Sequence, residues 1–257
     1  MRLVVLGSGT SFGVPVLGCD CAVCRSDDPR DRRTRVAALV ESADGRRLLI
    51  DTPPEVRLQL LRAGVGSVDA VLYTHDHADH VHGIDDLRAM TGRGQTLPVY
   101  GSADTLARLA ARFPYIFDRA VRPPPGTSKP ELVPRVLEPL RDESIAGFSV
   151  VPLPVPHGDV EVLGYRVGAV GYVTDAKLVP AECLTRLRGV RVLVLNALFE
   201  RPHPTHLSIP EAIAVARTVG AERTILTHLT HRQTHALLAA RLPVGVEPAY
   251  DGLEVVF

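Results

Sequence analysis

The stretch Thr74-His75-Asp76-His77-Ala78-Asp79-His80 places four potential metal-binding side chains within six residues. It follows directly on the apolar run 68–73, which has the composition of a buried strand. As the chain leaves a strand, alternate side chains point to the same side, so positions 75 and 77 can face one point. A turn beginning near Asp79 can aim Asp79 and His80 at a neighbouring point. Imidazole and carboxylate ligands favour zinc or manganese over calcium, so the stretch predicts a centre for two such ions.

The alternative interpretation of this stretch is a polar loop in which histidines occur by chance. Leaving four ligand-type side chains unpaired at the exit of a buried strand would be costly, and this favours the metal centre.

The composition excludes several classes of protein. The chain has 257 residues, 46% of them apolar, which is enough for a large core. The formal net charge is zero, whereas a surface built for long nucleic acids normally carries a basic excess. The first apolar run, 3–6, is far shorter than a signal-peptide core, and no apolar run reaches the length of a membrane span. We therefore expect a cytoplasmic protein that binds neither membranes nor long nucleic acids.

Periodicity and turn residues predict a succession of strands and helices. Ser208, with Pro210 and Glu211 after it, marks the start of one helix. The proline-rich stretch 119–131 predicts a loop or flap. The strands are expected at 2–6, 36–41, 47–50, 68–73, 147–153, 161–168, 170–174, 191–195, 223–227 and 253–257. The helices are expected at 56–63, 84–90, 103–113, 180–187, 208–219 and 233–240. With no linker in view, this order predicts an α/β fold in which residues 1–257 form one domain of two packed sheets flanked by helices.

The motif His-x-His-x-Asp-His at 75–80 resembles the signature of the metallo-β-lactamase-fold hydrolases. That resemblance implies an αβ/βα sandwich with metal ions at the edge of the sheets. The family takes further ligands from the second half of the chain: a histidine, a bridging aspartate and a final histidine, each at the end of a strand. His157, Asp175 and His228 follow expected strands in this order.

The resemblance implies a role for each of these residues. One metal ion would be held by His75, His77 and His157. The other would be held by Asp79, His80 and His228, and Asp175 would bridge the two ions. Asp51, after the strand 47–50, resembles the acid that supports the ligand loop and would hydrogen-bond a ligand histidine. The alternative for Asp51 is a simple turn or cap residue.

Three of the four cysteines are crowded into Cys19, Cys21 and Cys24. Cys-x-Cys-x-x-Cys spacing can fill three corners of a zinc tetrahedron, and such clusters in cytosolic proteins more often bind metal than form disulfides. For the fourth ligand, Cys183 lies in an expected helix and is better explained as a core thiol. His231, three residues beyond His228, is the stronger candidate. A reactive redox triad is the alternative to a structural zinc.

The stretches 6–15 and 18–24 together resemble one subfamily, the cyclic phosphodiesterases of the PhnP type, which act on phosphoribosyl 1,2-cyclic phosphate. The resemblance runs nearly end to end and is weakest over 115–145. It implies a structural zinc on the three cysteines and His231. It also implies that His206, in a His-x-Ser-x-x-Glu-Ala context, lies near the metal ions without binding them. His206 would then protonate the leaving oxygen, because imidazole titrates near neutrality. The alternative is that His206 only caps the helix.

The expected activity is that of a phosphoric diester hydrolase with two zinc or manganese ions and one structural zinc. A hydroxide shared between the two metal ions would attack a small, open or cyclic, phosphodiester such as a phosphoribosyl cyclic phosphate. Asp79 and His206 are the expected catalytic residues, and a homodimer is left open. His82, His203 and His235 are interpreted as surface or supporting residues.

Three rival functions are weighed against this expectation. A tRNA 3′-end nuclease would need an RNA-binding arm, which the neutral charge does not favour. A thioesterase or lactamase gives no reason for the cysteine cluster or for His206. A non-enzymatic PqqB-like protein would resemble this chain in its cysteine cluster. The complete set of expected active-site ligands disfavours this alternative.

Overall fold

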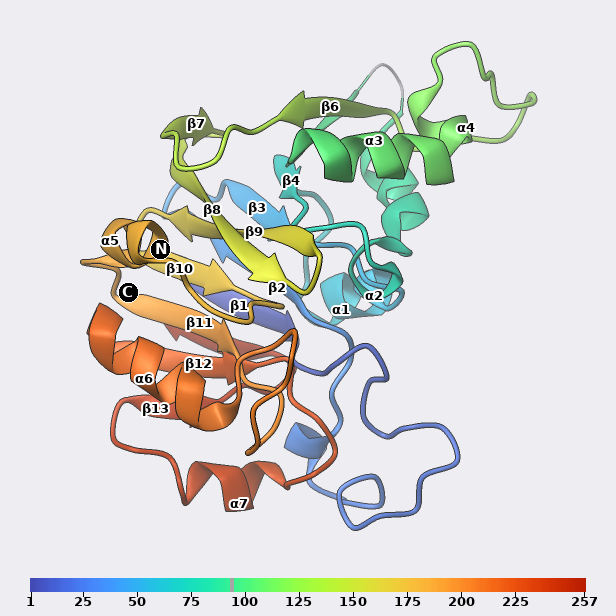
Figure 1. Ribbon diagram of the computed structural model, residues 1–257. Coiled ribbons are helices and arrows are strands. Elements are labelled where there is room, and N and C mark those ends of the chain that lie inside the picture. Colours follow the sequence, from blue (N-terminus) through green and yellow to red (C-terminus); the bar gives the residue numbers. More distant parts are fainter. Residues whose placement is uncertain (93–94) are drawn as a thin grey trace.

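The protein is an α/β sandwich with two seven-stranded sheets at its centre (Figure 1). The structure is a computed structural model that describes residues 1–92 and 95–257. The first sheet contains, in spatial order, β14 (Leu253–Val256), β1 (Arg2–Gly7), β2 (Ala37–Glu41), β3 (Arg47–Ile50), β4 (Ala70–Leu72), β5 (Leu97–Gly101) and β6 (Leu132–Val136). The second contains β13 (Val246–Pro248), β12 (Arg223–Thr227), β11 (Val192–Asn196), β10 (Val170–Val173), β9 (Val160–Val167), β8 (Phe148–His157) and β7 (Glu143–Ile145).

Alternation along the strands builds the layers of the sandwich. In β1, Leu3 and Val5 face the second sheet, whereas Val4 and Leu6 pack under the helices of the outer layer. In β11, Val192 and Val194 lie in the core between the sheets, and the residues between them face the other way. Both faces of the central strands are therefore buried, which is why these segments are continuous apolar runs in the sequence.

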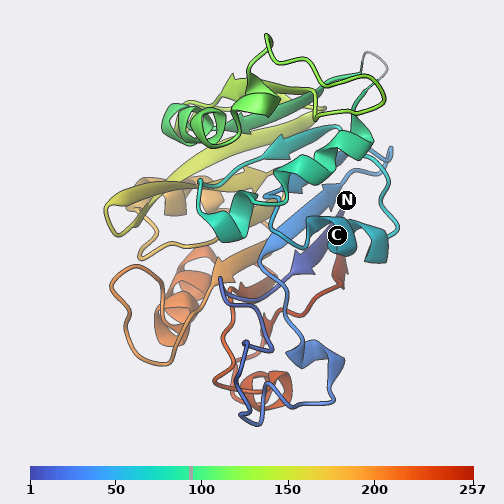
Figure 2. The ribbon, with the colours of Figure 1, turned by 90° about the vertical axis from the view of Figure 1, so that its right-hand side faces the viewer.

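Helices cover the outer face of each sheet. The first sheet is covered by the region holding α1 (Val56–Arg62), α2 (Ala78–Val81), η2 (Ile84–Met90), α3 (Ala103–Arg112) and α4 (Pro114–Phe117). The second is covered by α5 (Ala181–Leu187), α6 (Ile209–Val219) and α7 (His235–Ala239). The short 3₁₀ helix η1 (Pro29–Asp31) belongs to the N-terminal segment 11–35, which lies beside α7 in Figures 1 and 2. No helix among the described residues is long and apolar enough to span a bilayer.

The expected α/β sandwich with helices outside is confirmed. Differences are local. The helix expected at 84–90 is a 3₁₀ helix, and the strand expected at 147–153 runs on to His157, which therefore ends β8 instead of following it. The sequence analysis did not predict β5, β6, β7, β13, α2 or α4. The proline-rich stretch 119–131 forms no helix or strand, as expected.

Candidate metal centre

The candidate site lies at one edge of the sandwich, where several strands end. β3 and β4 are parallel, and so are β10, β11 and β12, so their carboxyl ends meet at the same edge. β8 runs antiparallel to β9, which is antiparallel to β10, so β8 ends at that edge too. This pairing brings together residues that are more than 150 positions apart in the chain, from His75 to His228.

The structure brings the expected ligands close together. Ligand atoms within 4.8 Å of one another define four overlapping groups. They are His75, His77 and His157; Asp79, His80 and His228; His75, His80 and Asp175; and His157, Asp175 and His206. Asp175 therefore lies between the first two groups. Its carboxylate is 3.1 Å from Nε2 of His80 and 3.1 Å from Nε2 of His228.

Orphaned ring nitrogens show that these residues fit metal ions. Nε2 of His75, of His80 and of His228 is buried and makes no hydrogen bond among the described residues, although the Asp175 carboxylate lies 3.1 Å from the last two. A buried donor or acceptor without a partner carries a cost of about 1–3 kcal/mol, so such atoms are rarely left unused. His77 is exposed, which leaves one side of the group open to solvent. The two clusters could therefore hold metal ions.

Asp51 orients two of the ligand histidines. It is fully buried, and Oδ2 lies 2.8 Å from Nδ1 of His80. Oδ1 accepts from the backbone N–H of Thr74, and Oδ2 also accepts from the Thr74 hydroxyl at 2.8 Å. Because that hydroxyl donates to Asp51, it accepts from Nδ1 of His75 at 3.0 Å. Both histidines thus use Nδ1 as a donor and keep Nε2 free, the arrangement expected for histidines that bind metal.

The electrostatics of the cluster favour a positive charge at its centre. Burial works to lower the pKa of His80, but the surrounding carboxylates, Asp175 foremost, outweigh it and hold that pKa well above its ordinary value. Burial likewise opposes ionisation of Asp175, yet His228 and His80 hold its pKa well below its usual range. A cation among these carboxylates is therefore stabilised, whether it is a proton on His80 or a metal ion.

His206 lies against the residue shared by the two groups. Nε2 of His206 is 2.8 Å from Oδ1 of Asp175, and because the carboxylate accepts, the ring donates from Nε2. Nδ1 is 2.8 Å from the hydroxyl of Thr205, whose carbonyl accepts from Nδ1 of His157 at 3.0 Å. Burial lowers the pKa of His206 despite Asp175 nearby. One short segment thus orients both a candidate ligand and the candidate acid.

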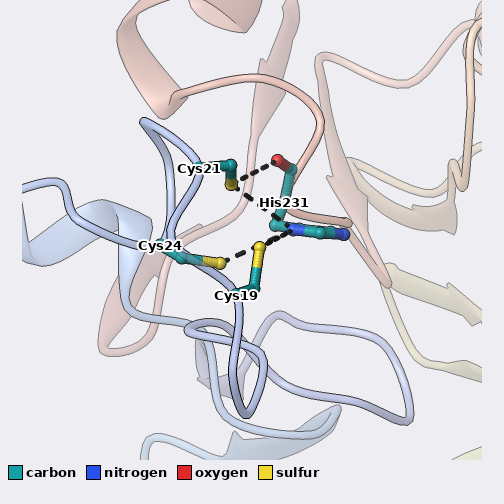
Figure 3. A group of neighbouring side chains, drawn as sticks. All are labelled: Cys19, Cys21, Cys24 and His231. Atoms are coloured by element: carbon teal, nitrogen blue, oxygen red, sulfur yellow. Dashed lines mark hydrogen bonds between the residues drawn. The ribbon is translucent and has the colours of Figure 1, made fainter.

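The three cysteines and His231 form a separate group, in which their side chains point toward one another (Figure 3). Nδ1 of His231 is 3.4 Å from Sγ of Cys19 and 3.5 Å from Sγ of both Cys21 and Cys24. The backbone N–H of Cys24 stabilises the Cys21 thiolate, which lowers the pKa of Cys21 to about 6, whereas burial raises the pKa of Cys24 to about 11. Three sulfurs around one imidazole nitrogen could therefore hold a metal ion.

Comparisons with known proteins agree with this geometry. The family model described as "Beta-lactamase superfamily domain" matches residues 46–229, which include all seven candidate ligands of the metal centre. The chain belongs to this family. It is also 39% identical to a solved structure described as a new diphosphatase from the PhnP family, with a TM-score of 0.90 over 99% of this chain and 97% of that one. The resemblance to metal-dependent hydrolases of the PhnP type is therefore confirmed.

The chain is also similar to two proteins that are described with other functions. It is 40% identical to an octanoyltransferase of Porphyromonas gingivalis over its whole length, but it spans only 51% of that protein. Indeed, the chain spans about half the length of the first curated relatives it matches. Zinc-bound PqqB from Methylobacterium extorquens shares the fold, with a TM-score of 0.81 and 21% identity over 100% of both chains.

The remaining cysteine and histidines of the chain lie outside the two clusters. Cys183 is buried in α5 and donates to the carbonyl of Pro154 at 3.2 Å, which suits a core thiol. His82 is exposed, and His203 is 3.4 Å from His206 through their Nδ1 atoms. His235 was expected at the surface or in a supporting role. It is buried at the start of α7, where its backbone N–H donates to Asp31, away from the metal centre.

Some residues that support the candidate site carry no local signal in the sequence. Arg112, at the end of α3, is paired with Asp76 at 2.7 Å and also donates to its backbone carbonyl. Asn196 fixes the turn after Asp175 by accepting from the backbone N–H of Ala176 and donating to its carbonyl. Asp51, Asp175 and His228 adopt positive φ angles of 64°, 52° and 58°. Such backbone conformations are uncommon outside glycine and concentrate at functional sites.

Proposed function

We propose that this metal-dependent hydrolase is a phosphodiesterase that acts on a small, open or cyclic, phosphodiester such as a phosphoribosyl cyclic phosphate. The observation that carries the proposal is the position of Asp175. It lies between two ligand groups and at the same time beside a histidine, His206, that neither group needs. Two metal sites with an extra donor next to them suit a reaction in which a phosphorus–oxygen bond is cleaved and its leaving oxygen needs a proton.

Each of the two ligand sets would hold one metal ion. His75, His77 and His157 would hold one ion, and Asp79, His80 and His228 the other, with Asp175 shared. Bound zinc or manganese ions supply Lewis acidity and a nucleophilic water at neutral pH. The exposed side of His77 gives a substrate access, while Asp51 and Arg112 hold the ligand loop behind it. A structural zinc on Cys19, Cys21, Cys24 and His231 would hold the last ligand loop in place.

His206 would act on the leaving group. Its Nε2 already donates towards the shared carboxylate, and Thr205 fixes the ring from the other side. A leaving oxygen that approaches Asp175 would lie within reach of the same donor, so His206 can pass it a proton or a hydrogen bond.

A second candidate substrate is a diphosphate. The 39% identical relative of the PhnP family is described as a diphosphatase. Cleavage of a P–O–P bridge needs the same ligand sets and the same donor, and the leaving group is then a phosphate oxygen in place of an alkoxide. The octanoyl transfer named for the Porphyromonas relative belongs to a protein about twice as long, of which this chain spans 51%.

A substrate panel separates these candidates. Purified enzyme loaded with zinc or manganese is assayed with bis(p-nitrophenyl) phosphate, ribose cyclic phosphates, cyclic nucleotides, diphosphate-bridged nucleotides and a β-lactam. The proposal expects release of a phosphomonoester from the diesters and no lactam opening. Cleavage of the diphosphates alone would favour the second candidate. No cleavage of either class by fully loaded enzyme would refute the proposal.

A further inference from the structure

A cavity of about 470 Å³ lies behind the segment that carries His206. It is lined by residues 197–202, by Ile209 at the start of α6, by Leu238 in α7, and by Arg33, Leu229, Thr230, Arg232 and Gln233. In Figure 1 these segments lie between α6, α7 and the N-terminal loop. Small-molecule sites typically occupy about 300–1,000 Å³, so the cavity is large enough for a ligand. None of the candidate metal ligands lines it.

The walls of this cavity are largely apolar. Leu198, Leu229 and Leu238 are buried and face it, and Ile209 closes one side. Phe199, which is half-buried, lines both this cavity and an adjoining one of about 220 Å³. These side chains suit an apolar or aromatic body, which gains by leaving water and by contact with the ring of Phe199.

The charges on the lining do not cancel. Glu200 is paired with Arg241 at 3.1 Å and accepts from Gln233 at 2.7 Å. Arg33, fully buried on the lining, is paired with Asp31 at 3.0 Å.

Arg201 and Arg232 supply the excess of positive charge. Both line the cavity, and across residues 1–92 and 95–257 neither guanidinium has a carboxylate partner. Their two positive charges are therefore left over at the mouth of an otherwise apolar cavity. Arginine is the side chain best shaped to bind carboxylate or phosphate in two parallel hydrogen bonds.

We propose that this cavity is a second ligand site, which binds a small organic anion with an apolar or aromatic body. The body would pack against Leu198, Leu238 and Phe199, and a carboxylate or phosphate-type group would pair with Arg201 and Arg232. None of the contacts proposed for this ligand involves the metal centre. The two sites are nevertheless connected, because the lining of the cavity contacts the segment around His206. Backbone hydrogen bonds from Leu198 to Leu207 and from Ile209 to Phe199 tie the lining to the segment around His206. An occupant therefore packs against the segment that positions the candidate acid.

Calorimetric titration of the metal-loaded protein tests this site. The two probes are decanoate, with an aliphatic body and a carboxylate, and 1-naphthyl phosphonate, which is aromatic and resistant to hydrolysis. Arg201→Glu reverses one unpaired charge on an exposed residue. Arg57→Glu is the matched control, because Arg57 is exposed on α1 and does not line the cavity. Leu238→Trp fills the cavity without changing charge.

The site predicts that at least one probe binds to the wild type and to Arg57→Glu alike, with affinity reduced roughly tenfold or more in Arg201→Glu. The probe that binds identifies the acidic group as a carboxylate or a phosphonate. Leu238→Trp should abolish binding of the probe, while the metal centre and the cysteine cluster keep their metal content. Absence of binding by both probes would overturn the proposal, as would equal binding by wild type and Arg201→Glu. The metal-centre proposal survives either result, because its own test is hydrolysis.

Discussion

The imidazole of His206 lies 2.8 Å from the carboxylate of Asp175, between the two groups of candidate metal ligands. Asp175 lies between the two ligand sets that the resemblance implied, and His206 belongs to neither of those sets, although it also groups with His157 and Asp175. A residue in this position can contribute to chemistry without being needed to hold a metal ion. Metal content and turnover should therefore respond differently when it is removed.

Replacement of His206 by alanine should lower turnover about a hundredfold or more, because a positioned acid typically contributes that much to the rate. Metal content, measured by inductively coupled plasma spectrometry, should stay at the wild-type level. His82→Ala is the matched histidine control, since His82 is exposed, and it should keep near wild-type activity. Loss of metal together with activity in His206→Ala would instead place His206 among the ligands.

Replacement of Asp51 by asparagine should weaken metal binding. The amide keeps the size of the side chain but cannot accept from both Nδ1 of His80 and the Thr74 hydroxyl with a charged oxygen. Removing such a supporting acid typically costs about 10–100-fold in affinity or activity. Competition with a metal-sensitive chelator measures the change. Asp44→Asn, in an exposed turn, is the control, and equal affinities in the two variants would argue that Asp51 is only a turn residue.

Replacement of Arg112 by glutamine should destabilise the fold by about 1–3 kcal/mol, because it leaves the nearly buried Asp76 carboxylate without its charged partner. Arg108→Gln, on the same helix, removes an exposed pair with Asp104 and should change stability by about 0.5 kcal/mol or less. Urea unfolding of both variants measures the difference. If the two variants unfold alike, Arg112 does not hold the ligand loop.

These residues also show what the sequence could and could not predict. The candidate ligands at 75–80 were predictable because they follow an apolar strand in a motif of recognisable spacing. His157, Asp175 and His228 could be proposed because they stand where the resemblance asks for ligands near strand ends, and His231 because it lies three residues from His228. Arg112 pairs with a residue 36 positions away, and that contact exists only once α3 packs beside the ligand loop. β5 and β6 were missed because glycine and proline residues interrupt their apolar pattern. The two strands are fixed by pairing with each other in the sheet, which the local pattern does not show.

Alkylation of the zinc-free protein should modify Cys21 before Cys24. The thiol of Cys21, with a pKa of about 6, is mostly ionised at pH 7, whereas that of Cys24, with a pKa of about 11, stays protonated until far higher pH. Because only the thiolate reacts, the rate at Cys21 should rise as pH increases through about 6 and then level off. Iodoacetamide labelling followed by peptide mass mapping gives the order. Bound zinc should protect all three cysteines, and equal labelling with and without zinc would contradict a zinc site there.

The most direct test of the central claim joins metal content to hydrolysis in one titration. Metal-depleted enzyme, with its cysteine site kept loaded, is titrated with manganese or zinc while hydrolysis of bis(p-nitrophenyl) phosphate is followed. A centre built on two ligand groups that share Asp175 predicts that activity saturates at two ions per chain and is lost in Asp175→Ala. Saturation at one ion, or full activity in Asp175→Ala, would contradict the two-metal account.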